Sequence, residues 1–216
     1  MMNTEETVTD FDGLRFVVAR YNEDVEWVPK LLSRFPGAKC TIYNKGVTET
    51  VPANGYEVLT LENVGRESHT YLHHIVESYK HFQEEGADKI IVFLQGDPLD
   101  HCVGSSLFDR VHAGVLKIMT GSGFEDIGTN IIQIINGVPT FHPSIREELA
   151  QTSQDLFETA LPNNFQFSAG ALFAVSVDCI SNRPVSFYEK AIGMLDSDVN
   201  PVRGFCFERL WSLIFR

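Results

Sequence analysis

The clearest fold signal in the chain is KIIVFLQGDPLDH, residues 89–101. Its first part, Lys89–Leu94, is an almost continuous apolar run, which is typical of a β-strand covered on both faces. Four polar side chains follow this strand at once: Gln95, Asp97, Asp100 and His101. In open α/β sheets ligands bind beyond the carboxyl ends of the strands, so this turn is expected to lie at a binding site.

The segments upstream of this strand alternate between strand and helix patterns. Short runs rich in apolar and β-branched residues predict strands at Leu14–Arg20, Lys39–Tyr43 and Tyr56–Leu61. Helices are predicted at Glu26–Phe35 and at Arg66–Phe82, where apolar residues recur at helical spacing. Asn63 is expected to cap the second of these helices and Gly86 to end it.

The segments downstream of the central strand continue the pattern. Ile127–Asn136 and Phe165–Val177 are expected to form strands, and Val185–Leu195 and Phe205–Phe215 to form helices. This alternation predicts an α/β fold with a central, mainly parallel sheet flanked by helices. We expect a single domain over residues 14–216, preceded by a polar tail over residues 1–13.

The charge of the chain limits its partners. With 17 basic and 29 acidic side chains among 216 residues, the formal net charge is −12. This excess of acid argues against non-specific binding of nucleic acid, which requires clustered Lys and Arg. An anionic ligand would have to be held by a few placed cations, by backbone N–H groups or by a bound metal ion.

Membrane and targeting signals are not apparent in the sequence. No segment approaches the 18–20 apolar residues needed to span a bilayer, and the acidic start does not resemble a signal peptide. The four cysteines form no CxxC pair, and Cys40, Cys179 and Cys206 are expected to be buried thiols. These features together favour a cytoplasmic location.

Four segments at the predicted carboxyl ends of strands form the candidate binding rim: Arg20–Asp24, Asn44–Gly46, Asn63–Glu67 and Gln95–His101. Within this rim, Asp97 is placed to hold a hard divalent cation that bridges a diphosphate, although an Asp-Pro turn would use the same residues.

Away from the rim, His69 and His73 lie four residues apart. Because they fall outside the apolar stripe of their helix, they are expected to face solvent or a neighbouring loop.

Several motifs, in order, resemble a known family: VVARYNEDVEW (17–27), IYNKG (42–46), NVGRESHTYLHHIVESY (63–79), VFLQGDP (92–98) and FSAGALFAVS (167–176). The chain looks like a nucleotide-sugar glycosyltransferase of the GT-A fold. It is similar to the glycosyltransferase domain of large algal viruses and to a fungal and viral family of largely unassigned function. This resemblance covers about residues 14–216 and implies a GT-A-like, Rossmann-like domain.

The resemblance implies roles in donor binding. In GT-A enzymes the turn after the first strand grips the base and ribose of the nucleotide, and here that turn holds Arg20, Tyr21, Asn22 and Asp24. A solvated turn with a helix cap would account for the same residues. Asn44 and Lys45 could read the base edge or neutralise phosphate, or form a plain turn.

Other donor-binding residues lie further along the chain. Arg66 could bind phosphate or a sugar carboxylate at a helix start, or pair on the surface with Glu62 or Glu67. The small residues Ala169 and Gly170 could let sugar and acceptor approach the backbone, or could accommodate a packed aromatic side chain.

The resemblance also implies a metal site. GT-A enzymes carry a D-x-D motif that holds Mn²⁺ or Mg²⁺ against the donor diphosphate, and Gln95-Gly96-Asp97 stands in its place here. Asp97 would then be the metal ligand, with Asp100 or His101 as the second, and Gln95 would lie beside the donor.

Glu208 is the candidate catalytic base, because it lies in the narrow polar sector of an otherwise apolar helix, where burial would raise its pKa. A structural ion pair with a nearby Arg is the competing interpretation, and Asp196 and Asp198 are less favoured bases.

Together these features predict transfer of a sugar from a UDP-sugar to a hydroxyl acceptor such as a glycan, within one domain of what could be a longer protein. The alternatives are a non-catalytic nucleotide- or sugar-binding domain and a metal-dependent phosphoesterase that uses Asp97, Asp100 and His101.

Overall fold

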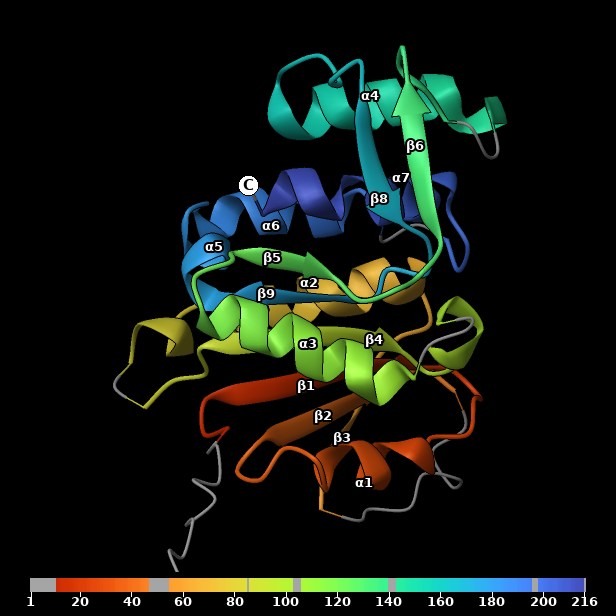
Figure 1. Ribbon diagram of the computed structural model, residues 1–216. Coiled ribbons are helices and arrows are strands. Elements are labelled where there is room, and N and C mark those ends of the chain that lie inside the picture. The colour runs from red at the N-terminus through yellow and green to blue at the C-terminus, as the bar shows by residue number, and fades with distance from the viewer. Residues whose placement is uncertain are drawn as a thin grey trace, which may run out of the picture.

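The main sheet has six strands (Figure 1). The computed structural model describes residues 11–46, 55–84, 86–102, 106–139, 143–195 and 198–215. Within them the strand order is β3 (Glu57–Thr60), β2 (Lys39–Asn44), β1 (Leu14–Arg20), β4 (Ile90–Gln95), β9 (Phe173–Ser176) and β5 (Phe124–Asp126). The predicted α/β architecture, a central sheet flanked by helices, is therefore confirmed.

The sheet is mixed rather than parallel throughout. β1 pairs in parallel with both β2 and β4, and β2 pairs in parallel with β3. β9 pairs antiparallel with both β4 and β5. The predicted parallel character thus holds for strands β1 to β4, whose carboxyl ends meet at one edge of the sheet.

Helices cover both faces of the main sheet. The face that carries Phe16 and Val18 packs against α1 (Trp27–Leu32) and α3 (Leu107–Met119). The opposite face carries Val17 and Ala19. It packs against α2 (Arg66–Ser78), α6 (Val185–Gly193) and α7 (Val202–Ile214). Successive residues of β1 point to opposite faces, so a continuous apolar strand is what two buried faces require.

A smaller antiparallel sheet lies beside α7 and α4 (Figure 1). Its order is β7 (Val138–Pro139), β6 (Ile131–Ile135) and β8 (Phe165–Ser168), and α4 spans Arg146–Phe157. The apolar cluster on the α2 face also contains Ile132, Ile134 and Phe167 from this sheet. One core therefore joins the two sheets.

Two predicted strands differ from the observed ones. Phe165–Val177 is not one strand, because Gly170 and Ala171 adopt φ of +95° and +50° and turn the chain between β8 and β9. The predicted strand Ile127–Asn136 is shorter, and only Ile131–Ile135 forms β6.

The predicted helix boundaries also shift. The helix predicted for Arg66–Phe82 ends at Ser78, and a short 3-10 helix, η2, follows at His81–Gln83. Its N-cap is Gly65, at φ +64°, rather than Asn63. The elements that were not predicted are α3, β5, β7, α4 and the short helices η3 (Leu99–His101), η4 (Pro143–Ile145) and α5 (Val177–Ser181).

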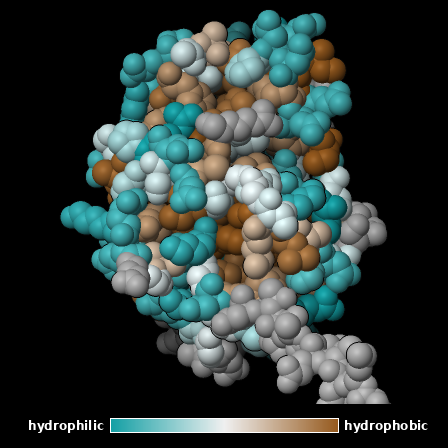
Figure 2. Space-filling view, turned by 60° about the vertical axis from the view of Figure 1, so that its left-hand side comes forward, coloured by the Kyte–Doolittle hydropathy of each residue, from teal (hydrophilic) through white to brown (hydrophobic). Residues whose placement is uncertain are grey.

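The described surface and thiols bear on the sequence predictions. No helix in the described ranges is long and apolar enough to cross a membrane. The four cysteines are free, and Cys40 and Cys206 are buried as expected, whereas Cys179 is partly exposed. Phe11, which the sequence assigns to the polar tail, is buried against Phe35. In the view of Figure 2 hydrophilic residues form most of the surface, and hydrophobic residues show in a central hollow and in separate spots.

Candidate functional site

Two adjoining pockets lie at the carboxyl ends of β1, β2 and β4. The first, the β1 pocket, has a volume of about 380 Å³ and is lined by Ala19, Arg20, Tyr21, Glu23, Lys45, Asn63, Arg66, Glu67, Gln95, Val199 and Asn200. The second, the α7 pocket, has a volume of about 230 Å³. It is lined by Arg66, Glu67, Gln95, His101, Asn130, Ile132, Phe167, Ala169, Gly170, Phe205, Glu208 and Arg209. Arg66, Glu67 and Gln95 line both and stand where the pockets meet.

Arg20 and Asn44 build the turn after β1. The Arg20 guanidinium donates to Asn44 Oδ1 at 2.6 Å and to the carbonyl oxygens of Glu23 and Tyr21 at 2.9 and 3.1 Å. Arg20 lines the β1 pocket, but only 4% of it is exposed. Asn44 is completely buried and is not among the described residues that line either pocket, so the structure places it in the turn itself, and its role in reading a base stays a prediction.

The other residues of this turn divide into pocket and surface positions. Tyr21 lines the β1 pocket and is 49% exposed, so its ring is available for stacking. Asn22 and Asp24 are exposed and are absent from the described lining of both pockets. Asp24 Oδ1 accepts the backbone N–H of Glu26 at 2.9 Å, which supports its interpretation as a turn residue. Glu23, which sequence reasoning missed, does line the β1 pocket.

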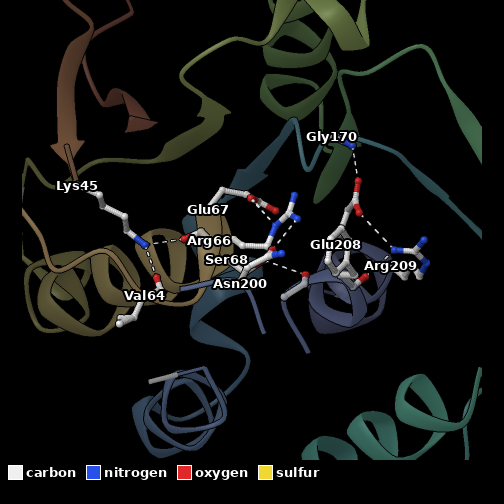
Figure 3. A network of polar contacts seen from close by, with 11 residues as sticks. Lys45, Val64, Arg66, Glu67, Ser68, Gly170, Asn200, Glu208 and Arg209 are labelled. Carbon is white, nitrogen blue, oxygen red and sulfur yellow. Dashed lines mark hydrogen bonds and ion pairs between the residues drawn. The ribbon is translucent and has the colours of Figure 1, made fainter. Parts of the chain in front are cut away.

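Lys45 fixes the start of α2 (Figure 3). Its Nζ donates to the carbonyl oxygens of Val64 and Arg66 at 2.5 and 2.6 Å, and burial lowers the pKa of Lys45 to about 8. These two bonds brace a segment in which both Gly65 and Arg66 have positive φ. Lys45 therefore positions the residues between the pockets, in addition to lining the β1 pocket itself.

Arg66 extends between the two pockets rather than onto an open surface. Its guanidinium lies 4.0 Å from the centre of the Phe205 ring and donates to Asn200 Oδ1 at 3.1 Å. Its Nε lies 3.4 Å from Glu67 Oε2. The pairing with Glu67 that the sequence suggested does form, but it forms at the junction of the pockets, where the cation can also meet an anionic ligand.

The predicted metal ligands in the turn after β4 lie in different places, since only His101 lines one of the two pockets. Asp97 is exposed, is absent from the described lining of both pockets, and accepts the Leu99 backbone N–H at 3.3 Å, as an Asp-Pro turn does. His101 does line the α7 pocket, and its ring packs so closely on Gly170 that a Cβ there would lie 2.3 Å from the His101 Cγ. Gln95 lines both pockets, and its buried Nε2 donates to no acceptor among the described residues.

A metal ion fits this site only with ligands from a donor. The described residues contain no group of three or more His, Cys, Asp or Glu side chains that could hold a metal ion. Mg²⁺ is commonly held by one or two carboxylates together with substrate phosphates and water. Asp97 can provide such a carboxylate, so the fit requires a bound diphosphate.

Glu208 holds the turn between β8 and β9. Its Oε1 accepts the backbone N–H of Gly170 at 2.6 Å, and its Oε2 lies 3.3 Å from the Arg209 guanidinium. Arg209 is buried, and its guanidinium lies 5.0 Å from the centre of the Phe167 ring and donates to the Phe205 carbonyl at 2.6 Å. Both carboxylate oxygens of the predicted base thus have partners. Of the less favoured bases, Asp198 lies beside Asn200, and Asp196 lies outside the described residues.

Glu67, like Glu23, lies in a segment of the predicted rim but received no role of its own from the sequence. Its side chain is 11% exposed and lines both pockets. Burial raises the pKa of Glu67, and the nearby charge of Glu208 raises it further, while Arg66 and the backbone N–H of Glu67 itself oppose the shift. The sequence feature that could have identified Glu67 as a site residue is its place in the NVGRESH motif, next to Arg66.

Two histidines of α2, His69 and His74, are buried, and His73 is partly exposed. His69 is 7% exposed, so it does not face solvent, and its ring stacks on that of His73 with 6.3 Å between the ring centres. His74 Nδ1 lies 3.0 Å from the Tyr43 hydroxyl. Burial lowers the pKa of His69 to about 4 and that of His74 to about 3, so both imidazoles are neutral at pH 7.

Comparison with known proteins gives no family assignment: no protein-family model matches the chain, and no curated protein matches it significantly.

Proposed function

We propose that the chain is a glycosyltransferase that moves a sugar from a nucleotide-diphosphate sugar, a UDP-sugar by the sequence resemblance, to a hydroxyl acceptor. The observation that carries this proposal is the pair of adjoining pockets at the carboxyl ends of β1, β2 and β4, with Arg66 between them. A two-part substrate with an anionic centre matches this arrangement. The order β3-β2-β1-β4 supports a GT-A-like, Rossmann-like domain.

The β1 pocket suits the nucleotide. Tyr21 offers an exposed ring on which a base can stack, and Glu23 and Asn63 offer acceptors and donors to ribose hydroxyls. Arg66, which stands where this pocket meets the α7 pocket, would contact the diphosphate. The sugar would then reach the α7 pocket past the turn that contains Ala169 and Gly170.

A divalent ion would be held by Asp97 together with the diphosphate, with Asp100 or His101 as the further ligand. When bound, Mn²⁺ or Mg²⁺ offsets the negative charge that develops on the departing diphosphate. The chain itself contributes Arg66, which lies 3.4 Å from Glu67 and is directed along the junction of the pockets. The free thiols fit a cytoplasmic reaction.

The test is a panel of nucleotides and nucleotide sugars, each with and without Mn²⁺, read by thermal shift and calorimetry. A ligand that binds only the folded state raises the melting temperature. We expect UDP and at least one UDP-sugar to bind and Mn²⁺ to strengthen binding. Absence of binding by every nucleotide at millimolar concentration would contradict the proposal.

A non-catalytic binding domain is the second candidate. It is favoured by one observation, namely that Asp97 is exposed and engaged by the Leu99 N–H rather than directed into a described pocket. Slow release of free sugar from the donor distinguishes the candidates, because a transferase hydrolyses its donor slowly and a binding domain does not. The phosphoesterase alternative predicts cleavage of generic phosphate esters by Asp97, Asp100 and His101.

A further inference from the structure

We propose that Glu67 is the catalytic group that accepts the proton of an uncharged sugar hydroxyl in the α7 pocket, and that Glu208 is a positioning residue that holds the Gly170 turn. This inference rests on the proposed transferase function and deepens it. It names the base, the class of acceptor and a different role for the carboxylate that the sequence favoured.

The position of Glu67 is the first reason. It is the one acidic residue, among those that the structure describes, that lines both pockets. Donor and acceptor must meet where the pockets join, so a base placed there can reach a hydroxyl beside the reacting carbon. Figure 3 shows the side chains of Arg66 and Glu67 extending toward Glu208.

The contacts of the two carboxylates are the second reason. Glu208 Oε1 receives a 2.6 Å hydrogen bond from a backbone N–H, and its Oε2 faces the Arg209 guanidinium. Glu67 has a longer contact of 3.4 Å, to Arg66 Nε, and otherwise, among the described residues, a hydrogen bond only from the N–H of its own backbone. Strong charge-assisted hydrogen bonds measure about 2.7–2.9 Å, so Glu67 is the less firmly held of the two. A proton acceptor needs an oxygen that can accept from the substrate.

The backbone explains what Glu208 does instead. Gly170 and Ala171 are consecutive residues with positive φ, and such a turn needs support from its surroundings. Glu208 supplies that support through the Gly170 N–H. This turn forms part of the wall of the α7 pocket, where Gly170 packs against His101. The His101 ring leaves no room for a Cβ at position 170.

The charges around Glu67 define the acceptor. The charged side chains around it are Arg66 on α2, Glu208 and Arg209 on α7, and Lys45 after β2, which lines the β1 pocket; the titratable groups nearby are His101 on η3 and the buried Tyr71. Within the α7 pocket two carboxylates and two guanidinium groups cancel, so this pocket does not select a charged ligand. Phe167 and Phe205 provide apolar faces, and Gln95 Nε2 provides a buried donor without a described protein acceptor. Apolar faces beside polar groups suit a neutral sugar.

The environment also makes Glu67 a stronger base. Burial and the charge of Glu208 raise the pKa of Glu67, with Arg66 as the main opposing influence. A base is most effective when its pKa lies near the working pH, and a raised carboxylate pKa moves in that direction. Glu67 would take the hydroxyl proton as the acceptor oxygen bonds to the anomeric carbon. The bond from that carbon to the diphosphate breaks, and its electron pair leaves with the nucleoside diphosphate.

The experiment compares three variants of the full chain: Glu67→Gln, Glu208→Gln and, as the matched control, Glu62→Gln at an exposed position just before α2. UDP affinity is measured by calorimetry, and transfer and donor hydrolysis are followed from pH 4 to 9. We expect Glu67→Gln to lower the transfer rate by about 10²–10⁴-fold with UDP affinity within about twofold, and to abolish the fall in rate toward low pH.

Glu208→Gln can still accept the Gly170 N–H, so we expect it to keep the pH dependence and to lose less than about tenfold in rate. Glu62→Gln is expected to match the unmodified protein. Loss of the pH dependence in Glu208→Gln, or its survival in Glu67→Gln, would overturn the assignment while leaving the transferase proposal intact.

A carboxyl-carbon NMR titration keeps the inference testable without a donor. The Glu67 resonance, identified by its loss in Glu67→Gln, should titrate above the ordinary glutamate range and shift when a neutral monosaccharide is added. Titration in the ordinary range overturns the inference even if UDP-sugars bind. Failure of all nucleotides to bind overturns the proposed function instead.

Discussion

Opposite charges meet at both ends of the main sheet, but in different ways. Near the amino ends, Arg15 Nε lies 2.5 Å from Asp88 Oδ2, the Asp88 side chain is 1% exposed, and Arg15 also donates to Thr41 Oγ1 at 2.9 Å. At the carboxyl ends, the pairs Arg66–Glu67 and Arg209–Glu208 measure 3.4 and 3.3 Å and line pockets.

This difference separates structural from functional charge. A buried pair repays the cost of leaving water only when its geometry is close. Arg15 and Asp88 meet at 2.5 Å, Arg15 is also bonded to Thr41, and among the described residues Asp88 Oδ1 has only the Lys39 ammonium, at 3.9 Å, beside it. The looser Arg66–Glu67 pair, beside both pockets, keeps part of its bonding capacity for a ligand, whereas Glu208 is also held by the Gly170 N–H. The following predictions test whether the amino end serves stability and the carboxyl end serves binding.

The largest expected effect is on stability, at the amino end. Asp88→Ala leaves the partly buried Arg15 without its carboxylate partner, so unfolding free energy should fall by about 3–5 kcal/mol, measured by urea denaturation. UDP affinity of the protein that remains folded should be unchanged. The control is Asp109→Ala, which removes an exposed pair with Arg34 and should change stability by about 1 kcal/mol or less. Equal effects of the two variants would contradict the comparison.

At the carboxyl end the expected effect is on binding. Arg66→Ala should weaken UDP binding by about 1.5–3 kcal/mol, the usual range for a hydrogen bond to a charged group. Calorimetry measures this loss, and Arg34→Ala, at an exposed cation far from the pockets, is the control. If Arg66→Ala instead lowered stability as much as Asp88→Ala and left UDP affinity unchanged, Arg66 would be structural.

The elements that the sequence predicted best are those with a clear hydrophobic periodicity. β1 was predicted at its exact bounds and α2 from its first residue, because a doubly buried strand and an apolar stripe have clear periodicities. The Gly170–Ala171 turn was not, since neither periodicity nor composition shows a positive φ at a non-glycine residue. Residues 103–164 held the missed elements α3, β5, β7 and α4: α4 has a weak apolar stripe and β5 and β7 are very short, whereas α3 has an apolar stripe as clear as that of α2 and was overlooked.

The site was predictable in outline but not in detail. The rule that ligands bind at the carboxyl ends of strands brought Tyr21, Arg66 and Gln95 to one place, and all three do line the β1 pocket. It did not reveal that Asn44 is buried by its bond to Arg20, because side-chain direction depends on tertiary contacts. Glu67 was missed because its neighbour Arg66 accounted for it as a simple ion pair.

Acid should weaken the α2 face of the core through His74. Its pKa is about 3 in the folded chain, against an ordinary value of about 6.5. Below pH 6.5 the unfolded chain gains a proton that the folded chain cannot accept until about pH 3, so stability present above pH 6.5 is lost as the pH falls. The loss is about 1.4 kcal/mol per pH unit, or about 2 kcal/mol by pH 5.

Urea denaturation at pH 7 and pH 5 measures this effect. His74→Gln should reduce the difference between the two pH values, whereas His81→Gln should not, because His81 is 45% exposed and pairs with Glu84 on the surface. An unchanged pH dependence in His74→Gln would assign the acid sensitivity to another group.

The smallest expected effect marks the outer limit of the site. Asp24 lies only three residues from Tyr21, but its Oδ1 is engaged by the Glu26 N–H in an exposed turn, outside the described lining of both pockets. Asp24→Ala should therefore lower the unfolding free energy by about 0.5–1.5 kcal/mol, the value of one hydrogen bond, and leave UDP affinity within about twofold. Asp24→Asn keeps the side-chain oxygen and should restore the stability. A turn residue that only accepts a local N–H does not contact the ligand. A loss of UDP affinity in Asp24→Ala comparable to that in Arg66→Ala would therefore show that the nucleotide site extends beyond the β1 pocket.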